Sequence, residues 1–341
     1  MSQSCCNPGS GCCAEPPKGF ETVSASLSIK DVLGGWKARW GIERMNYRVD
    51  PGLYAVGNPD GDSPVLVSAN YKLTFDMLRK NLSGLDCWLL ILDTKGVNVW
   101  CAAGKGTFGT DELVNRIEAV GLSDIVSHKK LILPQLGASG VSAHEVQRRT
   151  GFSILYGPVR ARDIKAFIAS DFRATREMRQ VRFTFKDRLV LTPLEFVETS
   201  KKSIIIYGVL FLLNLFAAKP FGLNDFILHE GAVLVGTVLT PILLPVVPVR
   251  AFSLKGWILG SCWTAPALWL VGWFGPGTWL LAAGYLLLLP SLAAYLAMNF
   301  TGCSTYTSPS GVLKEMKIAL PPIIGTSVIG MVLILIHRLI G

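Results

Sequence analysis

The C-terminal third of this sequence has very few charged residues, and this scarcity excludes a single water-soluble domain. Half of the 341 residues are hydrophobic, which is high for one aqueous domain. A helix that spans a membrane needs about 20 mainly apolar residues. The sequence therefore predicts an all-α transmembrane domain of about five helices over residues 203–341, at about 203–218, 226–249, 256–274, 277–298 and 318–336.

The common cysteine patterns of metal sites are also missing. Among eight cysteines, the pairs Cys5-Cys6 and Cys12-Cys13 match neither the C-x-x-C pairs of zinc sites nor the cysteine run of iron-sulfur clusters. Their Gly, Pro and Ser neighbours predict a disordered, Cys-containing tail over residues 1–30. Vicinal thiols also suit a soft metal such as Hg(II). A tail without an essential role and a tail that captures metal both remain open, and Cys303 is a further candidate for handling mercury.

Residues 1–20 have no apolar core of a secretory signal, so the soluble part is expected to stay in the cytoplasm. The net charge of +9 is concentrated before the apolar segments, where residues 171–202 are expected to form a basic juxtamembrane linker with short strands. Anionic lipid explains this position better than nucleic acid does. We therefore expect a multi-pass protein of the cytoplasmic (inner) membrane and no nucleic-acid partner. The basic residues that orient it are Lys201, Lys202, Arg250, Lys255, Lys314 and Lys317 on the cytoplasmic side.

Residues 31–170 alternate between apolar runs of strand length and amphipathic runs of helix length. This alternation predicts an α/β, Rossmann-like domain with a largely parallel sheet. Ligands of such sheets bind beyond the carboxyl ends of the strands, where Trp100, residues 134–140 and Gly157-Pro158 fall. The expected strands are 65–68, 87–93, 130–133 and 153–156, with an extended piece at 97–100. The expected helices are about 75–81, 110–120, 142–149 and 160–170.

The stretch 98–110 sets Cys101 among small residues between a strand and a helix, which suits a thiolate ligand or nucleophile beneath a large flat ligand. A Walker loop is excluded, because Gly106 follows Gly104-Lys105 where Ser or Thr is required. A dinucleotide fingerprint fits in letter, since Gly104 to Gly109 reads G-x-G-x-x-G and Asp124 follows about twenty residues on. A buried structural cysteine in a glycine-rich turn is the third interpretation, and the spacing alone leaves these alternatives open.

Four motifs carry a resemblance to a known family. They are Asn98-Val99-Trp100-Cys101-Ala102-Ala103-Gly104-Lys105, Pro134-Gln135-Leu136-Gly137-Ala138, Tyr156-Gly157-Pro158-Val159-Arg160-Ala161 and Asn299-Phe300-Thr301-Gly302-Cys303-Ser304-Thr305. The chain resembles, from about Gly35 onward, the mercury-methylation corrinoid proteins (the HgcA family), which are relatives of the large subunit of the corrinoid iron-sulfur protein. In that family the first motif forms a cap helix whose cysteine lies beneath the corrin ring.

The resemblance implies a membrane-anchored corrinoid-dependent methyltransferase that transfers a methyl group from a methyl-Co(III) corrinoid to Hg(II), giving methylmercury. Residues 31–170 would be the corrinoid-binding domain, and Cys101 would be the catalytic residue and the lower axial ligand of cobalt. The other expected cofactor-binding residues are Asn98, Val99, Trp100, Ala102, Ala103, Gly104, Lys105, Gln135, Gly137, Gly140, Gly157 and Pro158.

The sequence agrees with sulfur ligation in one respect. The usual signal of a histidine lower ligand, Asp-x-His-x-x-Gly, is absent, since Val126 precedes His128 by two residues and Leu131 follows it by three. A soft thiolate donates strongly to cobalt, and metal binding deprotonates a thiol. Because Hg(II) must receive a methyl group together with its bonding electrons, electron donation from the opposite side of cobalt favours that transfer.

The resemblance also implies partners. Electrons would come from a ferredoxin-like protein with two [4Fe-4S] clusters (HgcB), and the methyl group from a donor of the methyltetrahydrofolate type through a methyltransferase. Two other functions stay open at this point. One is a corrinoid methyl carrier of one-carbon metabolism with another acceptor, and the other is an NAD-dependent oxidoreductase that uses Gly104 to Gly109.

Overall fold

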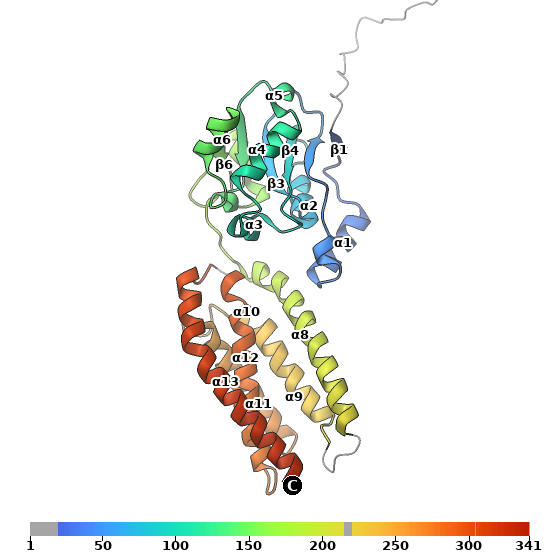
Figure 1. Ribbon diagram of the computed structural model, residues 1–341, viewed down its shortest axis with the longest axis vertical. Coiled ribbons are helices and arrows are strands. Elements are labelled where there is room, and N and C mark those ends of the chain that lie inside the picture. Colours follow the sequence, from blue (N-terminus) through green and yellow to red (C-terminus); the bar gives the residue numbers. More distant parts are fainter. Residues whose placement is uncertain (1–19, 215–219, 304, 341) are drawn as a thin grey trace, which may run out of the picture. The chain divides into compact units, whose positions relative to one another are not determined.

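The computed structural model describes residues 20–214, 220–303 and 305–340 (Figure 1). The chain divides into two compact units. One consists of Met1–Ala38 with Glu43–Gln180, and the other of Arg39–Ile42 with Val181–Gly341. We call them the α/β unit and the helical unit.

A six-stranded sheet forms the centre of the α/β unit, with strand order β1-β2-β4-β3-β5-β6. The β2–β4 pair is antiparallel and the other four neighbouring pairs are parallel, which makes the sheet mixed but largely parallel, as expected. The carboxyl ends of β3, β4, β5 and β6 therefore share one edge of the sheet. The strands are β1 (Glu21–Val23), β2 (Gly52–Val56), β3 (Val65–Ala69), β4 (Cys87–Leu92), β5 (Lys130–Leu133) and β6 (Ser153–Tyr156).

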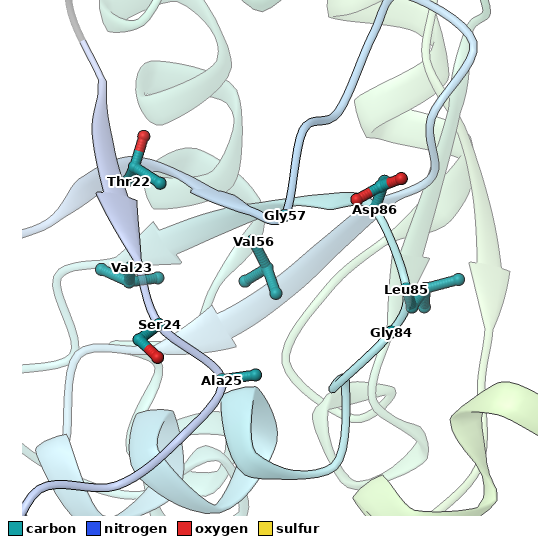
Figure 2. A pocket seen from close by; sticks show the side chains of 9 residues that line it. All are labelled: Thr22, Val23, Ser24, Ala25, Val56, Gly57, Gly84, Leu85 and Asp86. Atoms are coloured by element: carbon teal, nitrogen blue, oxygen red, sulfur yellow. The ribbon is translucent and has the colours of Figure 1, made fainter.

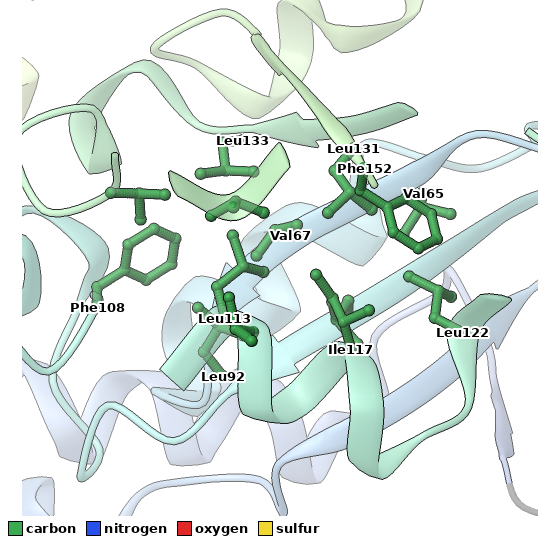
Figure 3. Close-up of a cluster of buried hydrophobic side chains, with 14 of the residues drawn as sticks. Val65, Val67, Leu92, Phe108, Leu113, Ile117, Leu122, Leu131, Leu133 and Phe152 are labelled. Carbon is green, nitrogen blue, oxygen red and sulfur yellow. The ribbon is translucent and has the colours of Figure 1, made fainter. Parts of the chain in front are cut away.

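Both faces of the sheet are covered, as Figure 1 shows. Alternate residues of β4 point to opposite faces, so Trp88, Leu90 and Leu92 join one core cluster while Leu89 and Ile91 join the other. Figure 3 shows part of the first cluster, in which Leu113 and Ile117 of one covering helix meet the sheet. Because β4 is buried on both faces, its sequence is continuously apolar.

The helices of the α/β unit follow the strands closely. Those expected at 110–120 and 142–149 are α4 and α6, and those expected at 75–81 and 160–170 are α2 and η3 with α7. The α-helices are α1 (Ile29–Arg39), α2 (Lys72–Lys80), α3 (Val99–Lys105), α4 (Thr110–Ala119), α5 (Leu122–Ile125), α6 (Ala143–Thr150) and α7 (Ile164–Ala169). The 3-10 turns are η1 (Arg44–Asn46), η2 (Gln135–Gly137) and η3 (Ala161–Asp163).

The helical unit consists mainly of long helices. Its elements are α8 (Phe185–Asn214), α9 (Leu223–Leu234), a π-helical segment η4 (Val235–Leu239), α10 (Thr240–Ile242), α11 (Phe252–Leu270), α12 (Trp279–Met298), η5 (Thr301–Cys303) and α13 (Pro309–Ile340). Within the described residues, three helices are long and apolar enough to cross a membrane, at Leu223–Ile242, Trp279–Met298 and Ser310–Leu339.

The expected count of about five spans is thus supported for three. All five segments contain helix, but α11 includes Trp, Gly, Ser and Pro residues that lower its hydropathy. In α8 the apolar part follows a charged first half, and residues 215–219 lie outside the described residues.

Three local expectations were wrong. Residues 97–100 were expected to be extended, but Val99 and Trp100 are helical because α3 begins at Val99, and its N-cap Asn98 has an extended backbone. Residues 171–202, all of which are described, contain no strand, and α8 begins at Phe185. The segment expected as a tail, 1–30, includes β1 and the start of α1, because the short β1 pairs with β2 at the edge of the sheet. Residues 1–19 lie outside the described part, so the tail remains a prediction there.

Candidate functional site

Cys101 lies in the first turn of α3, the short helix that follows β4. The side chain of Asn98 accepts a hydrogen bond from the Cys101 backbone N–H at 2.9 Å. Asn98 is therefore the N-cap of α3, and it satisfies an N–H group that has no partner within the helix. Gly106 ends the helix with a positive φ of 79°, a conformation that glycine adopts without strain.

The residues of α3 divide between two faces. Val99, Ala102 and Ala103 are buried and join the core cluster beneath the sheet edge. Trp100, Cys101, Gly104 and Lys105 are exposed. A spacing of three and four residues places side chains on one face of a helix. The inward residues therefore fix α3 to the domain and turn the Cys101 thiol outward.

The loop between β4 and α3 is held by Asn70, which directly follows β3. Asn70 is 1% exposed, and its side-chain oxygen accepts hydrogen bonds from the backbone N–H groups of Thr94, at 3.1 Å, and Gly96, at 3.0 Å. It also accepts from the Thr94 hydroxyl at 2.9 Å. Sequence reasoning missed Asn70, although an amide directly after a buried strand was a usable signal.

The loop after β5 packs closely against the end of α3. A Cβ at Gly140 would lie 2.1 Å from the carbonyl oxygen of Phe108 and 3.0 Å from the Cα of Ala103. A Cβ at Gly137 would lie 2.5 Å from the Phe108 ring, which is fully buried. Both glycines were expected to line the cofactor site. Their contacts show that they allow the backbone to approach α3.

The other expected site residues follow the carboxyl ends of β5 and β6. Gln135 lies half-buried in η2, and its side-chain oxygen accepts a hydrogen bond from Arg179 at 3.4 Å. Gly157 and Pro158 are buried, and the Gly157 N–H donates to the Leu133 carbonyl at 2.8 Å. The parallel sheet thus brings the loops after β3, β4, β5 and β6 to one edge, as the sequence predicted for the last three.

The dinucleotide interpretation of Gly104 to Gly109 is contradicted by α3. A fingerprint of this kind requires its first glycine in the tight turn directly after a strand. Here Gly104 and Lys105 are helical, and Gly106 to Gly109 connect α3 with α4. A phosphate group bound at the first of these glycines would therefore lie at the C-terminal end of α3 and not at the N-terminus of a helix.

A pocket of the α/β unit lies at the opposite edge of the sheet (Figure 2). Its volume is about 410 Å³, and it is lined by the ends of β1 and β2 and by the residues that precede β4. Asp86, the one ionisable residue of the lining, accepts a hydrogen bond from the Asn58 N–H at 2.8 Å. None of the expected site residues borders this cavity, so it is separate from the α3 site.

Two described thiols of the α/β unit differ sharply in environment. Cys101 is exposed, whereas Cys87 at the start of β4 is fully buried. Burial raises the pKa of the Cys87 thiol to about 12, and the Asp86 carboxylate acts in the same direction. Among the described residues there is no group of three or more His, Cys, Asp or Glu side chains that could hold a metal ion. Cys5, Cys6, Cys12 and Cys13 lie outside those residues.

This difference predicts selective alkylation. A raised pKa leaves Cys87 protonated and unreactive until the pH approaches that value, because the thiolate is the nucleophile. At about pH 8 we expect N-ethylmaleimide to modify Cys101 in the folded chain, whereas Cys87 reacts only after denaturation. Peptide mass spectrometry with and without denaturant measures both sites. Equal labelling of the two thiols in the folded chain would contradict the structure.

The part of the chain that contains α3 is similar in sequence to known proteins. Residues 40–168 match the family described as CdhD, CO dehydrogenase/acetyl-CoA synthase delta subunit. The acetyl-CoA decarbonylase/synthase complex subunit gamma of Methanocaldococcus jannaschii is 34% identical over 134 residues, which is 38% of this chain and 26% of that protein. The subunit of the same name from Methanopyrus kandleri is 33% identical over 130 residues, 38% of this chain and 28% of that protein.

The chain thus spans about a quarter of the length of the curated relatives it matches. The matched residues begin at Trp40 and end within α7. They include β4, α3 and Cys101. Residues 40–168 therefore form a domain similar to subunits of the CO dehydrogenase/acetyl-CoA synthase.

Proposed function

We propose that this chain is a membrane-anchored corrinoid-dependent methyltransferase whose methyl acceptor is Hg(II). In this proposal the Cys101 thiolate is the lower axial ligand of cobalt. The observation that carries it is the exposed Cys101 thiol on a rigidly held helix, in a motif that resembles the mercury-methylation corrinoid proteins. The similarity of residues 40–168 to acetyl-CoA decarbonylase/synthase subunits supports the broader class, methyl transfer on a corrinoid.

The outer face of α3 fits a large flat cofactor. Gly104 lies one helical turn after Cys101, and a Cβ built on it meets no described atom within 4 Å apart from its chain neighbours and its own helix backbone. Trp100, which precedes Cys101, is 39% exposed and offers an apolar ring to a ligand. A bound corrinoid supplies a cobalt ion that can take up and release a methyl group.

The chain's own residues would act chiefly by positioning. Asn98 fixes the first turn of α3 through the Cys101 N–H, and Asn70 fixes the loop that enters it. Lys105 is exposed at the end of the helix, where an ammonium group suits the amide or phosphate groups of a corrinoid tail. Gln135, Gly157 and Pro158 lie in the neighbouring loops, which are the proposed wall for that tail.

Mercury handling and electron supply belong to the same proposal. Hg(II) is soft and prefers sulfur ligands, which favours Cys5, Cys6, Cys12 and Cys13 as its carriers. We propose a ferredoxin-like partner with two [4Fe-4S] clusters (HgcB) as the reductant, and a methyltetrahydrofolate-type donor acting through a methyltransferase. The helical unit would anchor the chain in the cytoplasmic membrane, with the α/β unit in the cytoplasm.

A second candidate keeps the cofactor and changes the acceptor. The similarity to subunits of a complex named for acetyl-CoA synthesis favours a methyl carrier of one-carbon metabolism. The two candidates share Cys101 and the corrinoid, so they differ only in the group that receives the methyl.

The test uses the full chain, purified without oxygen and supplied with methylcobalamin. We expect the chain to retain the pigment through desalting and to form methylmercury when Hg(II) is added. A chain that retains the pigment and transfers the methyl group to a thiol acceptor but not to Hg(II) would support the second candidate. A chain that retains no pigment would overturn both.

A further inference from the structure

Helix α1 carries a stripe of exposed apolar side chains that nothing in the α/β unit covers. The stripe consists of Ile29, Val32, Leu33 and Trp36 of α1, and Trp40 is a further exposed apolar residue directly after the helix. Ile29 is 80% exposed, Leu33 57% and Trp36 61%. A spacing of three and four residues aligns these side chains along one face of the helix. Contiguous exposed apolar surface of this kind marks an interaction site more often than a random feature.

The opposite face of α1 is fixed to the α/β unit. Gly35 and Ala38 are buried, and the Asp31 carboxylate pairs with Lys72, at 2.6 Å, and with Arg79, at 2.8 Å. The helix start is also fixed, because the Ser28 N–H donates to Asp31 at 2.9 Å and the Asp31 N–H donates to the Ser28 hydroxyl at 3.2 Å. Because these contacts hold the opposite face of α1 against the α/β unit, the stripe faces outward.

The charges of α1 select the surface that the stripe fits. Asp31 is the only acidic residue of the helix and it faces inward, whereas Lys30 and Lys37 are exposed and lie along one edge of the stripe. An apolar face that contains Trp, bordered by lysines, is typical of a helix that lies in the interface of a bilayer. Lysines next to such a face attract anionic headgroups.

The chain itself contains helices able to cross a membrane. Trp40 directly follows α1 and belongs to the segment Arg39–Ile42, which groups with the helical unit. That unit contains the three helices able to cross a membrane. We propose that α1 is an interfacial helix, which lies in the headgroup region of the anionic membrane in which the helical unit is anchored. The proposal rests on that anchoring, but not on the corrinoid chemistry.

The experiment measures contact between Trp36 and lipid directly. The full chain is placed in nanodiscs of phosphatidylcholine and phosphatidylglycerol with brominated acyl chains, since bromine quenches the emission of a tryptophan that it contacts. The difference between wild type and Trp36→Phe isolates the emission of Trp36 from that of the other tryptophans. Trp269→Phe reports on a residue of α11 that is 71% exposed, and Trp88→Phe on one that is 2% exposed in the sheet core.

We expect Trp36 emission to be lost to the same extent as that of Trp269, while that of Trp88 persists. Leu33→Glu should reduce the loss at Trp36, and Asn115→Glu, on the exposed face of α4, should leave it unchanged. Discs without phosphatidylglycerol should quench Trp36 less. Quenching of Trp269 without quenching of Trp36 would overturn the proposal, because the stripe would then contact protein or water instead of lipid. Absence of quenching at both positions would also overturn the proposal, because Trp36 would then not contact lipid.

Discussion

Replacing Cys101 with alanine is expected to lower methyl transfer to Hg(II) to below about 1% of the wild-type rate, a loss of about 2.7 kcal/mol of transition-state stabilisation. The thiolate is the strongest electron donor that α3 offers to cobalt, and alanine offers none. The visible spectrum should change at the same time, since loss of sulfur ligation alters the absorption of the bound corrinoid. Methylmercury formation and the spectrum of the same sample provide the two readouts.

Cys262→Ala is the matched control for this prediction. Cys262 is also an exposed cysteine, but it lies on α11 in the helical unit, so its removal should change neither readout. Ala102, next to Cys101, is buried, whereas position 101 is exposed, so Cys101→Ala should not disturb the core. A variant with a normal rate and an altered spectrum would show that the thiolate binds cobalt without promoting transfer.

The sequence predicted most clearly the strands that are buried on both faces of the sheet. Residues 87–92 are continuously apolar because β4 lies between β2 and β3 and is covered on both faces. The antiparallel strand β2 was missed, since Gly52 and Tyr54 give it no long apolar run. The three-residue β1 was missed because its residues are mainly exposed at the edge. Hydrophobic pattern identifies central strands and says little about edges.

The start of α3 shows how two local signals compete. Val97, Val99 and Trp100 favour extended structure by propensity, and residues 97–100 were accordingly expected to be extended. The Asn98 cap and the burial of Val99, Ala102 and Ala103 at helical spacing outweigh that preference. The helix that the family resemblance implies for this motif is present as α3. Local propensity could not reveal it, because the deciding contacts come from the sheet beneath.

The glycines of the site show a different limit of the sequence. Gly104, Gly137 and Gly140 all indicate that something approaches the backbone closely, but glycine does not say what. At Gly137 and Gly140 the approaching atoms belong to Phe108 and Ala103. At Gly104 no described atom other than those of its chain neighbours and of its own helix backbone lies within 4 Å of a built Cβ. Only three-dimensional contacts separate a glycine needed for packing from one whose open side is available to a ligand.

This contrast gives the second large prediction, a pair of Gly→Ala substitutions with opposite effects. Gly140→Ala should destabilise the α/β unit by about 2 kcal/mol or more, because its Cβ meets backbone atoms of Phe108 and Ala103 that cannot rotate away. Gly104→Ala should stabilise α3 by up to about 1 kcal/mol, since alanine replaces glycine inside a helix without a clash. Thermal unfolding of the purified chain without cofactor measures both changes.

For Gly104→Ala we expect the effect on corrinoid affinity to be opposite to the effect on stability. The added methyl group would stand one turn from the Cys101 sulfur on the face where the ring is proposed to lie, so Gly104→Ala should weaken corrinoid binding at least about tenfold, or about 1.4 kcal/mol. A titration followed by visible absorption measures this in the same preparation. A stabilised variant that binds corrinoid as tightly as wild type would place the ring elsewhere. A stabilised variant that binds it weakly would mean that the open face of α3 is reserved for the cofactor, because the protein itself gains from filling it.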